Sequence, residues 1–398
     1  MFNRKLKLNT SQVPTRYSSL RVDGEWRDDI IVDLERVAHH EYVDTRGHTA
    51  SRLTPYVQTY FQEVAGSRGD YLRFEDGELG HHKEAKTRRR NALGRAICRS
   101  IAERHFQIWL FGHVEHALNG EMPHGLAHLR IERAKDNGDA PDYISVQGRR
   151  TPVLLEAKGH KRAHGLGTKK WSKWEAQISE NVNVKWGGTT VSVKGFVIAT
   201  RLLEISESPA PSRRHPDARI LDPSSPGEEL NNEAFPLDVR RATVAYHYAS
   251  ILNCLRLNEI ATQVRSGEPN GELFGVELPI WRCTQPPFED AEFAGFLTPY
   301  LGRDPVRQMR EWSYSPYSQR LLSRLTGVNW TLFALHKQRV RVLQSIVRYG
   351  IAESLQGERL QEPLQTEPIE TSDFSVIGDG TVIGSVEHFE LTGETIAL

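Results

Sequence analysis

The pattern of apolar and polar positions is clearest in the middle of the chain, where it predicts a β-hairpin. Two short runs rich in β-forming residues, Tyr143 to Val146 and Thr151 to Leu155, lie on either side of the turn-like sequence Gln147-Gly148-Arg149-Arg150. Such runs around a glycine-containing turn are typical of two antiparallel strands. We therefore expect strands near 142–147 and 152–157 that pair about this turn.

The segments around the hairpin predict further elements. A helix is expected at about 84–118 and a strand near 127–133. After the hairpin, a helix is predicted at 169–184, because apolar residues at spacings of three and four share one face: Trp171, Trp174, Ile178 and Val182. The apolar run KGFVIAT, Lys194 to Thr200, predicts a buried strand.

The predicted hairpin brings two carboxylates and an amine together. Asp142 and Glu156 are equidistant from Arg149, so pairing about the turn places them opposite each other, with Cβ atoms about 4.5–5.5 Å apart. Two carboxylates so close favour a bound cation, and Mg²⁺ typically uses one or two protein carboxylates together with water and phosphate oxygens. Residues two apart on a strand share a face, so Lys158 projects beside Glu156, where it can orient or help deprotonate an attacking water.

Pro141-Asp142 followed by Glu156-Ala157-Lys158 resembles the signature of the PD-(D/E)xK phosphodiesterase superfamily, which includes many restriction endonucleases, repair nucleases and Holliday-junction resolvases. The resemblance covers roughly 84–204. It implies an α/β fold with a restriction-endonuclease-like core, in which a helix, a three-stranded β-meander, a helix and a further strand form a mixed central sheet flanked by helices.

The resemblance also suggests further site residues. In several branches of the superfamily a Gln on the helix after the hairpin contacts the site, and Gln177 occupies that helix, although an ordinary solvated Gln is an alternative. Some members take a metal-binding carboxylate from the first helix, for which Glu103 is the candidate, with a solvated helix residue as the alternative. Asp139 is an alternative strand acid to Asp142, and His160 and His164 flank the site in a glycine-rich loop.

A bare Glu-x-Lys sequence carries little information, because Glu84-Ala85-Lys86 is a second copy in a polar, helix-forming stretch with no acidic partner behind a hairpin. The preceding Pro-Asp, the turn and the apolar strand distinguish the copy at Glu156. The alternative interpretation is a surface hairpin on which Glu156 and Lys158 form only an ion pair.

Charge is unevenly distributed, although 51 Lys and Arg balance 51 Asp and Glu. Eight bases and two acids occur from Lys83 to Arg104, and six bases without an acid occur from Lys158 to Lys173. Basic clusters on both sides of the predicted site suit the phosphate contacts that dominate nucleic-acid affinity. Charge runs are more often solvated faces, so the two clusters alone do not identify a nucleic-acid site.

Length and composition predict several domains, because 398 residues exceed the usual size of a single core. We expect an N-terminal region with a helix near Ser51 to Val64, then a nuclease core, a Pro-rich linker, a mainly helical C-terminal domain and an acidic tail: 1–75, 76–204, 205–235, 236–356 and 357–398. The C-terminal domain is predicted to contain helices from Leu237 to Val264 and Asn329 to Glu353, and a strand from Leu273 to Trp281. The tail holds nine acids and one base, and is expected to be solvated with a terminal hairpin at Gly378-Asp379-Gly380 or, alternatively, to mimic nucleic acid and cover the basic groove.

Several classes of protein lack support in the sequence. No run approaches a membrane span, and the N-terminus has no apolar stretch after its first residues, so we expect a soluble, cytoplasmic protein without a membrane partner. Cys98, Cys254 and Cys283 are too few and scattered for a disulfide framework or a zinc site. No phosphate-binding Gly-Lys-Ser/Thr loop is present.

The expected function is a Mg²⁺-dependent endonuclease, with Mn²⁺ as a substitute, that hydrolyses DNA without a covalent intermediate. Asp142 and Glu156 are expected to hold the metal and Lys158 to position the water. The additional domains favour a restriction or phage-defence effector that acts with a protein partner or as a homo-oligomer. A repair or recombination nuclease, RNA as substrate, and a non-catalytic nucleic-acid-binding or scaffold subunit of a defence complex are the alternatives.

Overall fold

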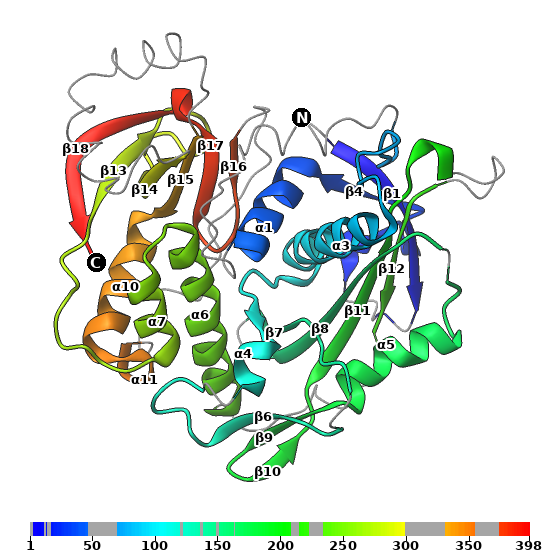
Figure 1. Cartoon of the computed structure of the whole chain (residues 1–398), viewed down its shortest axis with the longest axis horizontal. Coiled ribbons are helices and arrows are strands. Elements are labelled where there is room, and N and C mark those ends of the chain that lie inside the picture. Colours follow the sequence, from blue (N-terminus) through cyan, green and yellow to red (C-terminus); the bar gives the residue numbers. More distant parts are fainter. Residues whose placement is uncertain are drawn as a thin grey trace. The chain divides into compact units, whose positions relative to one another are not determined.

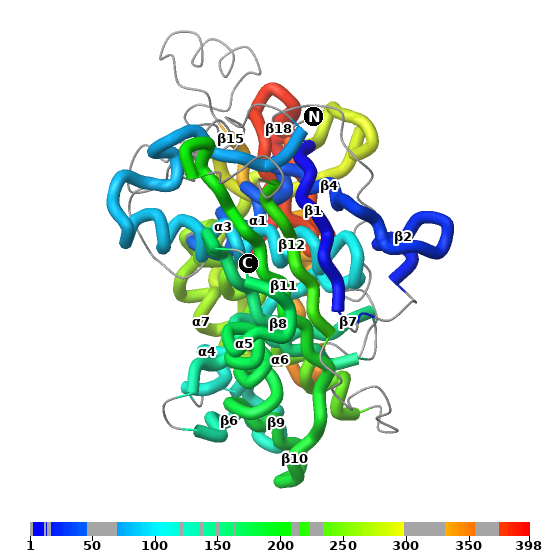
Figure 2. The backbone as a smooth tube through the Cα atoms, turned by 90° about the vertical axis from the view of Figure 1, so that its right-hand side faces the viewer, coloured from blue at the N-terminus to red at the C-terminus, as the bar shows by residue number. Residues whose placement is uncertain are grey.

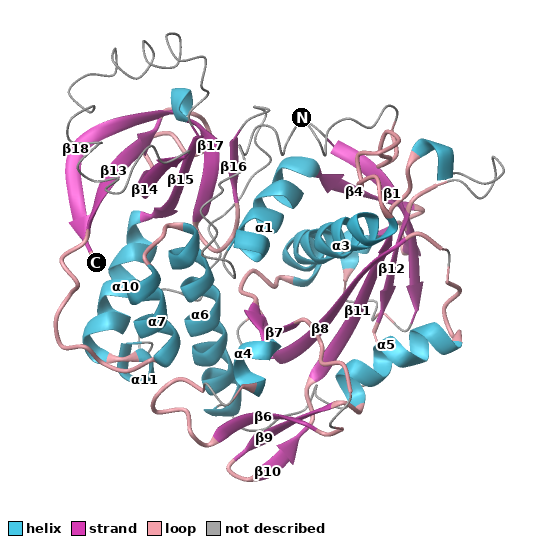
Figure 3. Cartoon of the chain, in the orientation of Figure 1, coloured by secondary structure: helices cyan, strands magenta, loops and turns pink. Residues whose placement is uncertain are grey.

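The structure is a computed structural model that describes residues 3–11, 13, 17–46, 70–119, 122–135, 138–148, 151–162, 164–207, 215–222, 234–298, 331–354 and 374–398. The chain divides into two compact units. The first unit comprises Phe2–Asp44 and Glu63–His247, and the second comprises Met1, Thr45–Gln62 and Tyr248–Leu398. Both units contain strands and helices (Figure 3), which confirms the mixed α/β class.

A seven-stranded mixed sheet of order β4-β1-β12-β11-β8-β7-β5 forms the centre of the first unit (Figures 1 and 2). Pairs β8–β11 and β1–β12 are parallel and the other neighbours are antiparallel. The strands are β1 (Asn3–Ser11), β4 (Asp29–Asp33), β5 (Gly112–His113), β7 (Tyr143–Gln147), β8 (Thr151–His160), β11 (Lys194–Arg201) and β12 (Asp217–Leu221).

Helices α3 (Lys83–Phe106) and α5 (Lys169–Ser179) pack on opposite faces of β8 and β11. Gly159 of β8 faces α3, whereas Leu154 of β8 belongs to the core cluster that contains Trp171 and Trp174 of α5. Because successive residues of a strand point to opposite faces, the two helices cover different sides. Every residue of β11 is therefore buried, as its apolar run predicted. The other helices of this unit are α1 (Leu34–Arg46), α4 (Val114–Leu118) and the part of α6 (Ala234–Cys254) up to His247.

The predicted hairpin is confirmed. Strands β7 and β8 pair antiparallel from Tyr143 opposite Leu155 to Gln147 opposite Thr151. Gly148 begins the turn with a φ of +55°, a left-handed conformation that favours glycine. This register places Asp142 directly before the residue that pairs with Leu155, and so beside Glu156.

The predicted three-stranded meander is wrong in its first strand. Residues Leu129–Arg133 form β6, which joins a separate three-stranded sheet of order β10-β9-β6 with β9 (Val182–Trp186) and β10 (Thr189–Val191). The short strand β5 takes the expected place beside β7. Leu129 and Ile131 pack in the α5-side core cluster from this second sheet, so the apolar alternation marked a strand without identifying its partner.

Two predicted helices end earlier than expected. The helix expected at 84–118 ends at Phe106, where Gln107 takes a left-handed φ of +58° and its N–H bonds to Ala102 O. The helix expected at 169–184 ends at Ser179, and Val182 begins β9. Val182 still packs in the same core cluster as Trp171. The apolar spacing therefore extended past the end of the helix into the next strand, and the predicted helix was too long.

Close contact between α3 and β8 fixes the strand that carries Glu156 and Lys158. A Cβ atom added to Gly159 would lie 1.7 Å from Arg90 O of α3, and one added to Gly94 would lie 2.4 Å from Gly159 N. Only hydrogen fits between these two backbones, so the helix rests directly on the strand.

Gly159→Ala is therefore expected to destabilise the first unit by about 1–3 kcal/mol, the usual cost of overpacking a tight contact. Differential scanning calorimetry of the full chain tests this. Gly165→Ala is the matched control, because its added Cβ would make an ordinary 3.6 Å contact with Thr168 Cγ2. Equal melting temperatures for the two variants would contradict the prediction.

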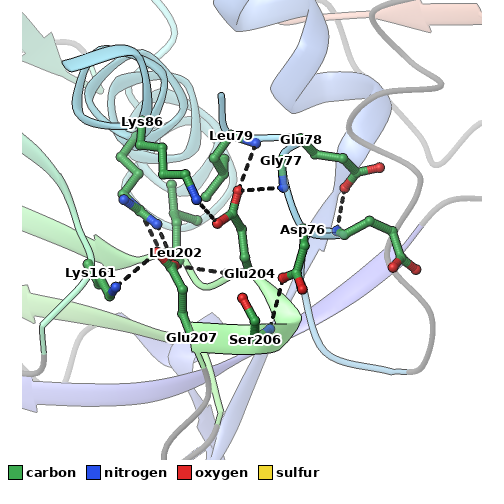
Figure 4. A network of polar contacts seen from close by, with 12 residues as sticks. Asp76, Gly77, Glu78, Leu79, Lys86, Lys161, Leu202, Glu204, Ser206 and Glu207 are labelled. Carbon is green, nitrogen blue, oxygen red and sulfur yellow. Dashed lines mark hydrogen bonds and ion pairs between the residues drawn. The ribbon is translucent and has the colours of Figure 1, made fainter. Parts of the chain in front are cut away.

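A polar network joins the start of α3 to the end of β11 (Figure 4). The Glu204 carboxylate is almost fully buried and accepts hydrogen bonds from Gly77 N (3.0 Å), Leu79 N (3.3 Å) and the Lys86 ammonium. Glu207 of the short 3-10 helix η2 (Ile205–Glu207) pairs with Lys161 and Arg90. The Glu84-Ala85-Lys86 copy of the motif thus supplies a structural lysine.

The predicted N-terminal region and linker differ from the structure. Strands β1 and β4 complete the central sheet, followed by α1, and β12 lies at 217–221 inside the expected 205–235 linker. Two minor strands, β2 (Arg21–Val22) and β3 (Glu25–Trp26), form a small ribbon after η1 (Ser18–Leu20). Strand β1 is nine residues long but largely polar, β4 and β12 have five residues each, and prolines flank β12, so composition concealed these strands. The helix predicted near Ser51 to Val64 lies outside the described residues.

The second unit contains a six-stranded antiparallel sheet of order β16-β17-β15-β14-β13-β18. Its strands are β13 (Glu277–Cys283), β14 (Glu292–Thr298), β15 (Thr331–His336), β16 (Phe374–Val376), β17 (Thr381–Ser385) and β18 (Phe389–Ala397). Its helices are α7 (Asn258–Ser266), α10 (Lys337–Tyr349), α11 (Ile351–Ser354), the part of α6 from Tyr248 and the 3-10 helix η5 (Val386–His388).

The prediction of a mainly helical C-terminal domain missed this sheet. The terminal hairpin predicted at Gly378-Asp379-Gly380 is present as β16 and β17, but its strands belong to the sheet and not to a solvated tail. The helix expected from Leu237 to Val264 is divided into α6 and α7 at Arg256, which has a φ of +61°. The segment expected as a helix from Asn329 contains β15 before α10, and the strand expected from Leu273 begins at Glu277. Residues 374–398 form three strands, because Phe374, Val376 and Val382 alternate into a buried core despite the acidic surroundings.

Candidate functional site

The site lies where β8 continues beyond its partner strand. Strand β7 pairs with β8 only as far as Leu155, so residues 156–160 have no β7 neighbour on that side. The side chain of Asp142 replaces part of the missing strand, because its Oδ2 accepts a hydrogen bond from Ala157 N (2.9 Å). The carboxylate is thereby fixed next to the Glu-x-Lys segment.

Glu156 is fully buried beside Asp142 and Lys158. Its Oε1 is ion-paired with the Lys158 ammonium, and among the described residues no hydrogen-bond donor satisfies its Oε2. Burial, followed by the charge of Asp142, raises the pKa of Glu156 well above its usual range. The sequence-based prediction that Glu156 and Lys158 share a face is confirmed.

Asp142 and Lys158 titrate in the same electrostatic environment. Burial raises the pKa of Asp142, against the opposing effects of the Lys158 charge, the Ala157 N–H and Arg95. Burial lowers the pKa of Lys158, but Glu156 and Asp142 outweigh it and the net shift is upward. Lys158 therefore stays charged at neutral pH and holds the two carboxylates together.

A cleft of about 620 Å³ opens over this segment. Asp142, Ala157 and Lys158 line it together with side chains from both flanking helices. Asn91 and Arg95 come from α3, and Lys170, Lys173 and Gln177 come from α5. The predicted hairpin, the helix before it and the helix after it thus meet at one cavity.

Gln177 reaches the cleft but contacts the backbone that precedes Asp142. Its side chain is 4% exposed, and its Nε2 donates to Ala140 O at 3.4 Å. Since Ala140 lies two residues before Asp142, Gln177 holds the loop that carries this carboxylate. The structure therefore gives Gln177 a positioning contact.

On the sequence-based expectation that Asp142 binds metal in a nuclease site, Gln177→Ala should lower metal affinity or cleavage roughly 10-fold, as is typical when a residue that orients a metal ligand is removed. Titration of cleavage rate against Mg²⁺ concentration tests this, with the shift expected in the half-saturating concentration. Ser179→Ala is the control on the same helix, because Ser179 is exposed and its hydroxyl donates to Glu175 O within that helix. The prediction fails if both variants titrate like the wild type.

Glu103 is not brought to the cleft. Its carboxylate pairs with His40 Nε2 at 2.8 Å and Arg36 Nη1 at 3.4 Å, both on α1. It is also absent from the residues that line the cavity. Glu156 is absent from that lining too, but it is ion-paired with Lys158, which lines the cavity. The prediction of Glu103 as a metal ligand is therefore unsupported, because one turn of a helix cannot be assigned to a face before the partner helix is known.

Of the other predicted residues, Asp139 and His160 line the cleft and His164 is not in its lining. Asp139 lines the cleft and its charge helps to raise the pKa of Lys158, while its backbone O accepts from Asn181 Nδ2 at 2.9 Å. His160 also lines the cleft, and its Nδ1 donates to Arg162 O at 2.7 Å. Burial lowers the pKa of His160 to about 4, so this ring is neutral at physiological pH. The His164 ring lies 5.4 Å from that of His160.

The basic run from Lys83 to Arg104 is largely neutralised by acids from distant segments. Its ion pairs are Lys86 with Glu204, Arg89 with Glu41, Arg90 with Glu207, and Arg95 and Arg99 with Asp44. The local charge therefore overstated the basic surface of this helix. Arg95 differs from the others because it also lines the cleft.

The acidic residue Asp44 gave no signal in the sequence. It is fully buried and accepts hydrogen bonds from Tyr143 Oη (2.5 Å) and Arg95 Nε (2.8 Å). Burial opposes its ionisation, but His113, Arg95 and Arg99 hold its pKa well below the usual range. The spacing of Asn91 and Arg95 on one helical face was the available signal for the α3 side of the cleft.

The chemistry of the donor set fits a hard divalent cation. Glu156 Oε2 is a buried carboxylate oxygen without a hydrogen-bond partner, and Asp142 lies next to it. In the part of the chain that the structure describes, no group of three or more His, Cys, Asp or Glu side chains could hold a metal ion. Mg²⁺ often binds through one or two carboxylates and completes its shell with water and phosphate oxygens, so a pair suffices.

Comparison of the chain with protein-family models, curated proteins and solved structures finds no match. Across the described ranges, no helix combines the length and apolar character that crossing a membrane requires. The interpretation of the site therefore depends on its own geometry.

Proposed function

We propose that this protein is a metal-dependent nuclease that hydrolyses phosphodiester bonds in DNA. The observation that supports this proposal is the buried Glu156 carboxylate, which lies against Asp142 and Lys158. Asp142 and Lys158 line a cleft with basic side chains on two walls, and Glu156 lies directly behind this lining. A buried carboxylate with an unpaired oxygen is costly unless a cation or a proton compensates it. A binding surface alone has no need of this arrangement.

The order of elements supports a restriction-endonuclease-like core and membership of the PD-(D/E)xK superfamily. Helix α3 is followed by β5, β7 and β8, which are neighbours in the sheet, and then by α5 and β11. This order matches the helix, three strands, helix and strand that the resemblance implies, with further elements inserted along the chain. The insertions are α4 and β6 between β5 and β7, and β9 and β10 between α5 and β11.

The residues of the chain have distinct roles in the proposed reaction. Asp142 and Glu156 would hold Mg²⁺ or Mn²⁺, which supplies Lewis-acid activation of water and charge neutralisation on phosphate when bound. Lys158, charged beside Glu156, orients the attacking water and offsets negative charge that develops on the scissile phosphate. Gln177 fixes the loop that carries Asp142 through Ala140 O.

Cleavage of supercoiled plasmid by the purified full chain tests the proposal, with Mg²⁺, with Mn²⁺ and with EDTA. We expect cutting that needs the metal and is lost in Lys158→Ala. Lys135→Ala is the matched control, because Lys135 is exposed, pairs with Glu180 and is not among the residues that line the cleft. Equal cutting by wild type and Lys158→Ala would overturn the assignment of the site.

A non-catalytic subunit of a defence complex is the second candidate function. Metal-dependent thermal stability separates it from the nuclease, because a scaffold has no reason to bind the cation at Asp142. An increase in melting temperature with millimolar Mg²⁺ or Mn²⁺ in the wild type but not in Asp142→Asn supports the nuclease. Without such an increase, the scaffold becomes the better interpretation.

A further inference from the structure

Arg95 is anchored at one edge of its guanidinium group and unused at the other. Its Nε donates to Asp44 Oδ2 at 2.8 Å. Its Nη1 and Nη2 groups form no hydrogen bond with any described residue. The side chain is 31% exposed, and it lines the cleft beside Asp142 and Lys158.

The anchor itself is rigid. Asp44 is fully buried on α1, and its other oxygen contacts Tyr143 Oη at 2.5 Å, His113 Nε2 at 3.2 Å and Arg99 Nη1 at 3.4 Å. Two helices and two strands therefore fix the position of this carboxylate. An arginine held at Nε by such a group loses little further freedom when its Nη groups bind a ligand.

The side chains that line the cleft indicate the chemistry of that ligand. Lys170 and Lys173 of α5 are exposed and line the same cavity, and neither has a resolved ion pair with an acid of the described chain. Arg95 lies on the α3 side, with Asp142 and Lys158 also in the lining. A cleft with cations on two walls suits a chain of phosphates, and the two Nη groups of arginine match the two oxygens of one phosphate.

We infer that Arg95 binds a backbone phosphate of the substrate through Nη1 and Nη2, while Asp44 holds its Nε. This inference rests on the proposed nuclease function, and it names a substrate-binding residue outside the Asp142, Glu156 and Lys158 set. Arg95 contacts phosphate independently of base identity, so it contributes affinity and register without sequence preference.

The test measures binding without cleavage. Fluorescence anisotropy of a labelled DNA duplex in EDTA gives the dissociation constant of the full chain at several salt concentrations. Arg95→Ala is expected to weaken binding roughly tenfold, and to reduce the slope of log K against log salt by about 0.9, the contribution of one phosphate contact. A residue with only a structural role would leave that slope unchanged.

Arg27→Ala is the matched control. Arg27 is exposed, lies near Arg104 at the C-terminal end of α3, and does not line the cleft. Arg27→Ala removes the same charge from the protein as Arg95→Ala does. General electrostatics alone would therefore give both variants the same slope of log K against log salt. Equal slopes for the two variants would overturn the inference.

Arg95→Lys provides the second variant if the alanine variant does not fold. Lysine retains a cation for Asp44, but its single ammonium cannot serve Asp44 and two phosphate oxygens together. We expect Arg95→Lys to fold, with a melting temperature close to that of the wild type, and to lose most of the affinity that Arg95→Ala loses. If Arg95→Lys keeps the wild-type affinity and slope, Arg95 does not bind Asp44 through Nε and phosphate through its Nη groups at the same time, and the inference is overturned.

The two proposals fail separately in this design. If the wild type binds DNA with the predicted slope difference but never cleaves it with metal, the nuclease is wrong and the phosphate contact stands. If the wild type cleaves DNA while Arg95→Ala keeps the wild-type slope, the phosphate contact alone is wrong. Absence of DNA binding by the wild type would overturn the Arg95 inference.

Discussion

Asp142→Asn is expected to reduce metal-dependent DNA cleavage on the order of 10³-fold, the loss typical of removing one charged or electrostatic group from a catalytic site. Asparagine keeps the shape of the side chain, and its Oδ1 can still accept the Ala157 N–H bond that Asp142 makes at 2.9 Å. The substitution therefore removes the charge and spares the backbone contact. Single-turnover cleavage of a labelled duplex at saturating Mg²⁺ measures the effect.

Asp139→Asn is the control for Asp142→Asn. Asp139 lines the same cleft three residues earlier, but its side chain is exposed and only its backbone O is hydrogen-bonded. We expect less than a tenfold effect there, since an exposed rim charge contributes little in high dielectric. A large loss at Asp139 with little loss at Asp142 would show that the strand acid had been assigned to the wrong residue.

The hairpin could be predicted because local sequence determines it. The two β-rich runs and the glycine turn specify antiparallel pairing, and the register follows from the turn, so Asp142 and Glu156 become neighbours without reference to the rest of the chain. Lys158 then shares the face of Glu156 by strand periodicity. The buried run of β11 and the apolar face of α5 were equally local.

Long-range pairing could not be predicted in this way. Strands β1 and β12 are separated by about 200 residues and pair in parallel, and neither contains a strong apolar run. Glu103 was predicted as a metal ligand because a helix residue has no assigned face until its neighbour is known, and that neighbour is α1 of the N-terminal region. Asp44, on the same helix, was missed for the same reason, although it fixes Arg95.

Glu156→Gln is expected to reduce cleavage about as much as Asp142→Asn does, on the order of 10³-fold. The same substitution is expected to make the metal-free protein more stable. Glu156 is fully buried, its Oε2 has no hydrogen-bond partner, and Asp142 repels it. Removing this charge relieves the cost of burying it without a cation. Opposite changes in activity and stability at one residue would be hard to explain for a merely structural glutamate.

The pH dependence of stability distinguishes the protonated from the ionised state of Glu156. Burial and Asp142 raise its folded pKa above the unfolded value near 4.5, so the folded protein holds this proton more tightly. The stability linked to that proton is fully present below about pH 4.5 and is lost as pH rises through the raised folded pKa. In EDTA, the melting temperature of the wild type should therefore fall more steeply from pH 5 to pH 8 than that of Glu156→Gln.

The comparison between the wild type and Glu156→Gln isolates the titration of Glu156 from that of other groups. Glu41, whose pKa burial raises to about 7, loses its proton in the same range in both proteins, and its effect cancels in the difference. Mg²⁺ should restore the wild type at pH 8 and leave Glu156→Gln unchanged, because a cation replaces the proton only where the carboxylate is present. If Glu156→Gln is instead less stable than the wild type in EDTA at pH 8, Glu156 serves the fold through its pairing with Lys158, and the metal site is excluded as the reason for its burial.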